Sequence, residues 1–220
     1  MSARVKDVMT TRVVAVRRNA GFKDIVALLG EYRVSAFPVL DGDGIVLGVV
    51  SEADLLSKEA LVAATGALVA RLGQVNGPAH HDDFAKAAAV TAGELMTSPP
   101  IVVTPYELVA NAARLMYHGR VKQLPVVGER GELVGIVSRS DVLSVYSRPD
   151  GEIRGEIVEN VILNGLFADP DRFVVTVSSG IVTLEGLPET TARGREIVAE
   201  SWHVEGVVSV RDRLTYPEGL

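Results

Sequence analysis

Cysteine is absent from this 220-residue chain. Its absence excludes disulfides, thiolate metal sites and a cysteine nucleophile. Aromatic residues make up only 5% of the sequence and charged residues 23%, a composition typical of a globular protein with an aliphatic core. The N-terminus reaches an acid at Asp7 without an apolar run of signal-peptide length, and no later run approaches a membrane span. We therefore expect a cytoplasmic protein of one or two domains.

Excess negative charge is missing from the first two thirds of the chain. Residues 1–151 contain 16 acids and 16 bases, whereas residues 152–220 contain 12 acids and 6 bases. The whole net charge of -6 therefore lies in the C-terminal third. An acidic surface repels nucleic acid and anionic lipid, so we expect no nucleic-acid partner and no membrane contact for this region.

An internal repeat organises the balanced part of the chain. A shift of 87 residues aligns Met9–Ser57 with Met96–Ser144 without a gap. Residues 9–58 then give 15 identities, where unrelated sequences would give about three. The shared anchors are four short segments: Met9-Thr10 with Met96-Thr97, Arg33-Val34 with Arg120-Val121, Pro38-Val39 with Pro125-Val126, and Gly48 to Asp54 with Gly135 to Asp141, the last pair reading Gly-x-Val-Ser-x-x-Asp.

Each repeat predicts the same order of elements: a short strand, a helix, two strands joined by a glycine-rich turn, and a final helix capped by serine. After residue 151 the pattern changes to a helix, two strands, a helix and a strand. The fold class is α+β (mixed α/β), with two pseudo-symmetric repeats packed as one module and a small α-β-β-α-β domain. The expected strands are Val13–Val16, Phe37–Leu40 and Ile45–Val50, then Ile101–Val103, Leu124–Val127 and Leu133–Val137, and finally Phe173–Ser178, Ile181–Gly186 and Val207–Tyr216.

Composition changes also set the expected domain boundaries. We expect the two repeats at residues 1–58 and 93–146, with an inter-repeat helix and loop at residues 59–92. Residues 147–151 have the composition of a linker, and residues 152–220 form the small domain, whose second helix runs from Pro188 to about Trp202.

The doubled Gly-x-Val-Ser-x-x-Asp motif is the strongest chemical signal. It lies at a strand-to-helix junction, where Ser51 or Ser138 could hydrogen-bond a phosphate. One turn later, the carboxylate of Asp54 or Asp141 could accept from the two hydroxyls of a ribose. The same residues could instead form a helix cap, with serine at the N-cap and aspartate three residues on, without any ligand. Both interpretations remain open at this stage.

These anchors together resemble the CBS domain family over about residues 4–146. Such paired repeats resemble Bateman modules, whose two clefts commonly bind AMP, ATP or another adenosyl ligand such as S-adenosylmethionine. By resemblance, Asp54 and Asp141 would bind ribose, and Ser51 and Ser138 would lie at the phosphate. The segments that start at Val13 and Pro100 would offer backbone groups to the base, and the helical faces would form a homodimer.

The resemblance also ranks the two repeats. The second repeat has Arg120 and Lys122 at positions where the family often places phosphate-binding bases, whereas the first has Arg33 and Ser35. The second set is the better phosphate clamp. The alternative is that these bases are solvated surface residues.

The last 70 residues resemble the BON family through the segments at 180–186 and 204–210. BON domains have been linked to membrane or small-ligand attachment, and no catalytic residues are associated with them. Because the local charge disfavours anionic lipid, we expect a contact with a protein partner, as yet unknown, or within the chain.

No motif predicts an enzyme. A Ser-His-Asp grouping, a P-loop and a dinucleotide fingerprint are absent from the sequence, and His80-His81-Asp82-Asp83 is interpreted as a solvated loop rather than a metal site. We predict a non-enzymatic regulatory protein that senses an adenine nucleotide (AMP, ADP or ATP) or S-adenosylmethionine, with no obligatory cofactor. The alternative is a structural dimerisation protein with empty clefts, whose C-terminal domain recruits a partner or a membrane surface.

Overall fold

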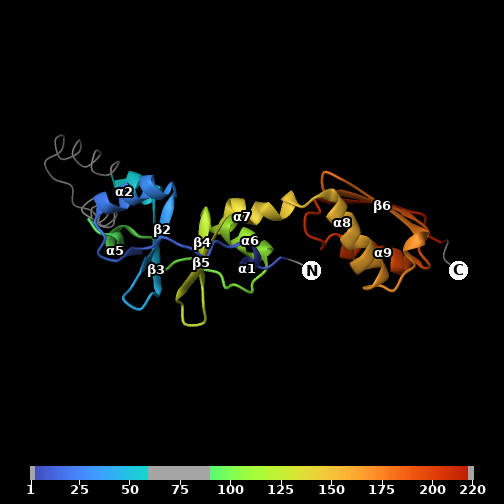
Figure 1. Ribbon diagram of the computed structural model, residues 1–220, viewed down its shortest axis with the longest axis horizontal. Coiled ribbons are helices and arrows are strands. Elements are labelled where there is room, and N and C mark those ends of the chain that lie inside the picture. Colours follow the sequence, from blue (N-terminus) through green and yellow to red (C-terminus); the bar gives the residue numbers. More distant parts are fainter. Residues whose placement is uncertain (1–2, 59–89, 218–220) are drawn as a thin grey trace, which may run out of the picture. The chain divides into compact units, whose positions relative to one another are not determined.

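The computed structural model describes residues 3–58 and 90–217 (Figure 1). It contains two compact units, one of Met9–Pro105 with Gln123–Val137, and one of Met1–Val8, Tyr106–Lys122 and Ser138–Leu220. Helices and several small sheets confirm the predicted mixed α/β class. The inter-repeat helix predicted after residue 58 and the segment His80 to Asp83 lie outside the described residues.

In the first unit, a three-stranded sheet has the order β1-β2-β3. Strand β1 (Val16–Arg17) runs parallel to β2 (Ala36–Leu40), which pairs antiparallel with β3 (Val46–Ser51). The predicted hairpin is confirmed. The strand predicted over Val13–Val16 was wrong in extent, because only Val16 and Arg17 find partners in β2.

Helix α2 (Phe22–Tyr32) connects β1 to β2 and covers the sheet of the first repeat. Its predicted apolar stripe is confirmed, since Ile25 and Leu29 are buried with sheet residues in one core. The other buried members of this core are Val16, Phe37, Val39, Val50, Leu55, Ala92 and Leu95, the last two from α5 (Ala92–Leu95).

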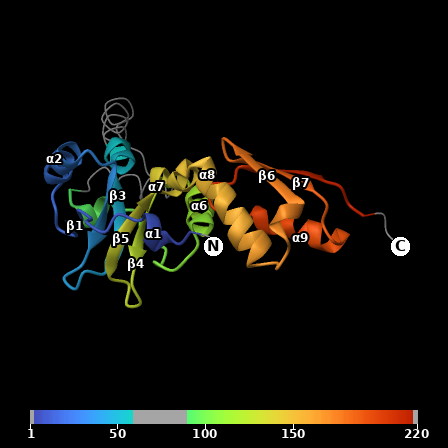
Figure 2. The same ribbon diagram turned by 45° about the vertical axis from the view of Figure 1, so that its right-hand side comes forward.

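The second hairpin, of β4 (Gln123–Val127) and β5 (Leu133–Ser138), forms a separate two-stranded sheet. Its turn lies beside the turn of the β2–β3 hairpin, because the Val46 amide donates to Gly131 and the Leu133 amide donates to Gly44 (Figure 2). The strand predicted at Ile101–Val103 is reduced to one bridge between Val103 and Val126.

The second unit contains the helices of the second repeat. They are α6 (Val109–Gly119) and α7 (Arg139–Leu143), which contact each other, and the 3-10 turn η2 (Ser144–Ser147). The short helix α1 (Val5–Val8) belongs to the same unit. The expected 3.6-residue spacing of apolar residues in α6 is confirmed by the burial of Ala112 and Met116.

The C-terminal part of the second unit has the predicted α-β-β-α-β order. Helix α8 (Asp150–Glu156) continues into the π-helix η3 (Ile157–Leu163), and the 3-10 turn η4 (Pro170–Arg172) precedes β6 (Phe173–Ser178). Strand β7 (Ile181–Gly186), helix α9 (Thr191–Ser201) and strand β8 (Ser209–Leu214) follow. The predicted bounds of β6 and β7 are confirmed. The second helix begins later than Pro188, because the Thr190 side chain caps it.

This C-terminal part has a core of its own. Its sheet has the order β6-β7-β8, with β7 and β8 parallel, and α8 and α9 lie along one side of it (Figures 1 and 2). The buried residues all come from positions 153–214, including Ile153, Val182, Leu184 and Ile197. Among the described helices of the chain, none is long and apolar enough to cross a membrane.

Candidate functional site

Each repeat begins with a Met-Thr pair that joins a strand of the other repeat. The backbone N–H and C=O of Thr97 pair with those of Val49 in β3, at 2.9 and 3.1 Å. The backbone of Thr10 pairs in the same way with Ile136 in β5, at 2.9 Å in both directions. The two anchors found in the sequence therefore meet in space, each Met-Thr against the Gly-x-Val-Ser segment of the opposite repeat.

The glycine of the Gly-x-Val-Ser motif is required by this close approach. A Cβ atom at Gly48 would lie 2.7 Å from both the Met96 Sδ and the Thr97 carbonyl oxygen. A Cβ at Gly135 would lie 2.8 Å from the Met9 Sδ. Both distances are well below van der Waals contact, so the motif glycine and the Met-Thr pair depend on each other.

The serine and aspartate of each motif bind each other. In the second repeat, the backbone N–H and the hydroxyl of Ser138 donate to Asp141 Oδ2 at 2.8 and 2.7 Å. In the first repeat, Ser51 donates to Asp54 Oδ2 at the same two distances. In the second repeat the Asp141 amide also donates to the Ser138 hydroxyl at 3.3 Å, which completes a capping box. The capping interpretation thus describes the local geometry.

The caps leave the second carboxylate oxygen for other contacts. In the first repeat this oxygen, Asp54 Oδ1, faces the Thr97 hydroxyl, which donates to it over 3.4 Å. A carboxylate has about four acceptor positions, and the bonds of the cap all go to Oδ2. One oxygen of Asp54 therefore lies at the junction with the opposite repeat, where the Met-Thr pair ends.

The remaining predicted site residues fall into different places. Val13 and Pro100 are half-buried and lie three residues after Thr10 and Thr97, respectively. Lys122 lies next to the start of α7, since its carbonyl accepts from the Arg139 amide at 3.0 Å. Arg120 lines a pocket together with residues of α6 and α7, among them Arg139.

A buried polar atom in β4 was not singled out in the sequence. The amide nitrogen Nε2 of Gln123 is buried and has no hydrogen-bond partner among the described residues. Gln123 occupies the position that Ala36 has in the first repeat. Since Ala36 pairs with Ser51 at the motif, comparison of the two repeats could have indicated this polar substitution.

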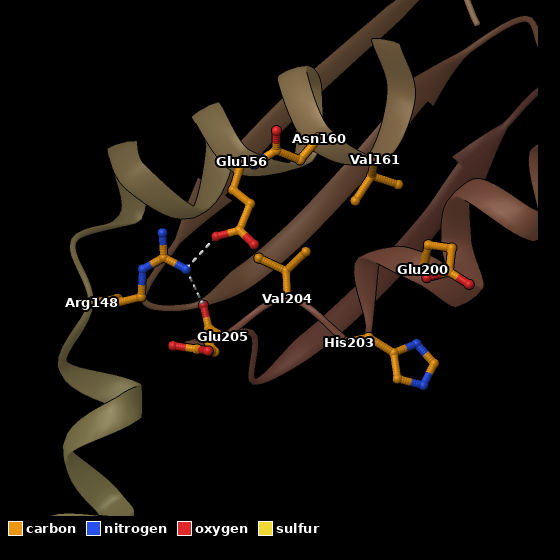
Figure 3. Close-up of a pocket in the computed structure, with 8 residues that line it drawn as sticks. All are labelled: Arg148, Glu156, Asn160, Val161, Glu200, His203, Val204 and Glu205. Carbon is orange, nitrogen blue, oxygen red and sulfur yellow. Dashed lines mark hydrogen bonds and ion pairs between the residues drawn. The ribbon is translucent and has the colours of Figure 1, made fainter. Parts of the chain in front are cut away.

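A second pocket lies in the C-terminal part, between the π-helix and the end of α9 (Figure 3). Its volume is about 890 Å³. Three carboxylates line it against one guanidinium, so the pocket is unsuited to a phosphate-bearing ligand. The lining residues are Arg148, Glu156, Asn160, Val161, Glu200, His203, Val204 and Glu205. No group of three His, Asp or Glu side chains in the described parts of the chain is arranged to hold a metal ion.

Arg148 lies between η2 and α8, closes one end of this pocket and binds α8 through Glu156. Its Nη1 lies 2.6 Å from Glu156 Oε2 and donates to the Glu205 carbonyl at 3.4 Å (Figure 3). Burial opposes the charged form of Glu156, but the hydrogen bond and the positive charge of Arg148, together with further favourable contacts, hold the pKa of Glu156 below its ordinary value. Burial likewise opposes the charge on Arg148, and its bond to Glu156 raises the pKa of the guanidinium.

Comparison with known proteins agrees with the repeat architecture. The CBS domain model matches residues 5–60 and 92–148, more than half of the chain. The protein MJ1426 of Methanocaldococcus jannaschii is 29% identical over 63% of this chain and 88% of its own length. The chloroplastic protein CBSX2 of Arabidopsis thaliana is 31% identical over 63% of this chain and 61% of its own length.

Solved structures include similar CBS pairs. The crystal structure of CBSX2 in complex with AMP covers 64% of this chain and 93% of that chain, with 31% identity and a TM-score of 0.49. The CBS pair of protein MJ0100, in complex with 5-methylthioadenosine and S-adenosyl-L-methionine, covers 67% and 98%, with 19% identity and a TM-score of 0.50; this likeness concerns the fold alone. Together with the duplicated motif and the reciprocal pairing of the repeats, the matched residues show that the chain belongs to the CBS domain family and contains a tandem CBS pair.

Proposed function

We propose that this chain is a non-enzymatic regulatory protein that binds an adenosyl ligand where the two CBS repeats meet. The observation that supports this proposal most directly is the position of Asp54. Its Oδ2 accepts the hydrogen bonds from Ser51, whereas its Oδ1 lies next to the Thr97 hydroxyl of the other repeat. A carboxylate oxygen beside a hydroxyl suits the vicinal diol of a ribose. Asp141 is proposed for the same role in the second repeat, and Pro100 and Val13 for backbone contacts to the base.

We propose that the side chain of Lys122 binds a phosphate group of the ligand. It lies beside the first turn of α7, next to the Ser138–Asp141 cap, and α7 itself has only five residues. A helix this short contributes little as an anion site, so the charge on Lys122 carries the contact. Ser51 and Ser138 remain proposed as hydroxyl contacts. Arg120, which lines the α6–α7 pocket beside Arg139, remains proposed as a second base for the phosphate.

The unpaired amide of Gln123 supports a polar ligand in the second repeat. Leaving a buried donor without a partner costs about 1–3 kcal/mol, and buried polar groups in folded proteins are normally paired. Gln123 alternates along β4 with the buried Leu124, so it lies on the opposite face of the strand. A ligand oxygen or ring nitrogen that accepts from Nε2 would remove this cost.

Calorimetric titration tests the proposal, with AMP, ADP, ATP and S-adenosylmethionine as probes. We expect binding of at least one probe, with affinity about tenfold or more lower in Asp54→Asn and Asp141→Asn, since a hydrogen bond to a charged group contributes about 1.5–3 kcal/mol. Glu129→Gln, in the exposed turn between β4 and β5, is the control and should bind normally. No heat with any probe at millimolar concentration contradicts the proposal.

Self-association through the helical faces is proposed as part of the same regulatory role. Several large apolar side chains of these helices are exposed, among them Leu56 at 69% and Tyr117 at 80%, and contiguous exposed apolar surface is typical of interaction sites. The same observation favours the second candidate function, a structural dimer with empty clefts. Light scattering separates the cases: dimers without ligand binding support the second candidate, and a monomer contradicts it.

For the C-terminal part, we propose a BON-like domain at residues 152–220 that contacts a protein partner or the chain itself in the cytoplasm. Its α-β-β-α-β order and its independent core support this proposal. The acidic pocket beside Arg148 weighs against anionic lipid. Flotation with anionic vesicles is the test, and binding of the isolated domain to them would contradict the proposal.

A further inference from the structure

The two edge strands of the C-terminal sheet, β6 and β8, differ in how their outer backbone groups are bonded. The pairing of β6 with β7 closes on Ser178 and Ile181, across a two-residue turn. Backbone groups that bond to β7 therefore belong to Ser178 and every second residue before it, so those of Val175 face outward. The Val175 carbonyl accepts from Nε of Arg154 in α8 at 2.9 Å. A side chain of the same chain thus occupies the β6 edge.

Strand β8 forms the other edge of the sheet. Directly after it, the Thr215 amide donates to the Gly186 carbonyl of β7 at 2.8 Å. Because amide directions alternate along a strand, the even-numbered residues of β8 face outward. The Leu214 amide agrees with this direction, since it donates to Asp212 Oδ1 at 3.0 Å. The backbone N–H groups of Val210 and Asp212 have no partner among the described residues, so part of this edge is open to a further strand.

The side chains on one face of β8 are basic. Arg211 and Arg213 are exposed, and they share a face because side chains alternate along a strand. Arg213 lies 3.3 Å from Glu185 of β7. Arg211 stands in register with the uncharged Thr183 and has no ion pair in the described parts of the chain. An acidic group beside β8 would therefore meet a guanidinium that no carboxylate of this chain holds.

The acid between the two arginines is bonded within the chain. Oδ1 of Asp212 accepts from the Leu214 amide, and Oδ2 accepts from the hydroxyl of Tyr216. Tyr216 in turn packs on α9, where a Cβ at Gly194 would lie 2.7 Å from its ring. Asp212 lies on the opposite face of the strand from Arg211, so its charge is directed away from an acid that approaches the two arginines.

The same charges disfavour pairing of β8 with a second copy of itself. In an antiparallel pair the outward-facing residues lie opposite one another. The registers that overlap most of β8 are centred on Arg211 or on Asp212, and they place Arg211 opposite another Arg211 or opposite Arg213. Like charges directly opposite each other are destabilising, whereas opposite charges stabilise the pair. The edge therefore favours a strand that carries acids.

We propose that β8 accepts an extended, acidic segment of a partner protein as a fourth strand of this sheet. The inference rests on the protein contact proposed above for the C-terminal part and specifies its surface. Backbone hydrogen bonds to Val210 and Asp212 provide the pairing, as in strand addition generally. In the antiparallel orientation, two acids separated by one residue lie opposite Arg213 and Arg211. The next residue lies opposite the half-buried Val210 and is apolar.

Fluorescence anisotropy with the full-length chain and the labelled peptide Ser-Glu-Thr-Glu-Val-Thr-Val-Ser tests the proposal. We expect saturable binding with a dissociation constant below about 1 mM, weakening as the salt concentration rises. The same peptide with lysine in place of both glutamates should bind about tenfold more weakly, because it places like charges opposite each other. Absence of saturable binding of the acidic peptide, or equal binding of the two peptides, would overturn the inference.

Charge reversal on the protein identifies the strand. Arg211→Glu should weaken binding of the acidic peptide about fivefold or more and strengthen binding of the lysine peptide. A variant that had merely unfolded would bind neither peptide. Arg130→Glu, in the exposed β4–β5 turn, changes the net charge equally and should bind as wild type does. Equal weakening in the two variants would indicate general charge attraction and contradict pairing at β8.

N-methylation of the peptide separates strand pairing from charge attraction. The threonine between the glutamates and the valine after them direct their amides toward β8, whereas the two glutamate amides face away. We expect methylation of the first two amides to weaken binding about tenfold or more, because it removes donors to the edge. Methylation of the glutamate amides should change binding less than about threefold. Equal effects of the two methylation patterns would exclude an added strand.

A second copy of the chain is the competing occupant of the edge. Since the chain has no native cysteine, Ser209→Cys places a single thiol on β8. We expect little crosslinking of this variant with a short bismaleimide, and efficient crosslinking would assign the edge to a second copy instead. Vesicle flotation tests the proposed protein contact separately. Failure of peptide binding without vesicle binding therefore overturns the added strand alone, whereas binding to anionic vesicles overturns the protein contact on which it rests.

Discussion

At the residue scale, the serine and aspartate of each motif serve the fold and the proposed site together. The cap uses one carboxylate oxygen, Asp54 Oδ2, and the hydroxyl of Ser51. Only the other oxygen approaches Thr97. The two interpretations of the motif are therefore compatible, because one side chain can cap a helix and present an acceptor to a ligand.

Gln123 offers a test in which stability and binding change in opposite directions. We expect Gln123→Leu to raise the free energy of unfolding by about 1–3 kcal/mol, because it removes a buried donor that has no partner among the described residues. The same variant should bind the adenosyl probe more weakly. Urea denaturation and calorimetry measure the two effects. Ala36→Gln is the converse control and should destabilise the first repeat; a Gln123→Leu variant less stable than wild type would contradict the prediction.

Gly135 offers a test of the reciprocal pairing of the repeats. We expect Gly135→Ala to lower the free energy of unfolding by about 1–3 kcal/mol, since the added methyl group would lie 2.8 Å from the Met9 Sδ and 3.1 Å from the Thr10 carbonyl. Gly42→Ala, at an exposed turn with no heavy atom within 4 Å of the new Cβ, should change the urea midpoint little. Equal midpoints for the two variants would argue against the close approach.

At the scale of elements, local pattern predicted what local interactions determine. The Ser179-Gly180 turn allowed β6 and β7 to be predicted with their observed bounds. The strand expected at Val13–Val16 is shorter, because the chain before it pairs through Thr10 with the other repeat. The apolar periodicity within one segment cannot predict a pairing with a distant segment of the chain. The proposed site residues show the same limit: both Ser–Asp pairs are recognisable as a sequence motif, whereas the contact between Asp54 and Thr97 depends on the fold.

The π-helix shows a further limit of periodicity. Ile153, Ile157 and Val161 have the spacing of an α-helix, which the sequence predicted. These three residues are buried as expected, but the chain also buries Ile162, directly after Val161. Hydrogen bonds that span five residues, from Asn164 to Glu159, accommodate this extra buried residue.

The contact between Arg148 and Glu156 of α8 makes stability depend on pH. The pKa of Glu156 lies below its ordinary value of 4.5, because burial, which would raise it, is outweighed by the hydrogen bond and charge of Arg148 together with further favourable contacts. The folded state therefore binds fewer protons than the unfolded state near this pKa, so the contribution is complete above about pH 4.5 and is lost as pH falls through the folded value. We expect Glu156→Gln to reduce the stability of the C-terminal domain by about 1–2 kcal/mol at pH 7 and to flatten its acid-side loss. Glu159→Gln, exposed on η3, is the control; parallel pH profiles for the two variants would contradict this assignment.

At the scale of the whole molecule, the C-terminal core and the core of the first repeat share no residues. The former comprises residues from Ile153 to Leu214, and the latter residues from Val16 to Leu95 and the partly buried Met96. A chain of this kind can unfold in more than one cooperative step, and a ligand stabilises only the part that it binds.

Because the two cores are separate, ligand binding should stabilise them differently in the intact wild-type protein. We expect two calorimetric unfolding transitions, of which the one assigned to the CBS pair moves upward with AMP or S-adenosylmethionine. At a ligand concentration of about 100 times the dissociation constant, the gain is about 2.7 kcal/mol. The transition of the C-terminal part should stay in place and can be identified by its shift in Glu156→Gln, because Glu156 is not one of the residues proposed to bind the ligand. A ligand that moves both transitions equally would contradict independent domains, because mass action would then require ligand contacts in both or a coupling between them that carries the full binding energy.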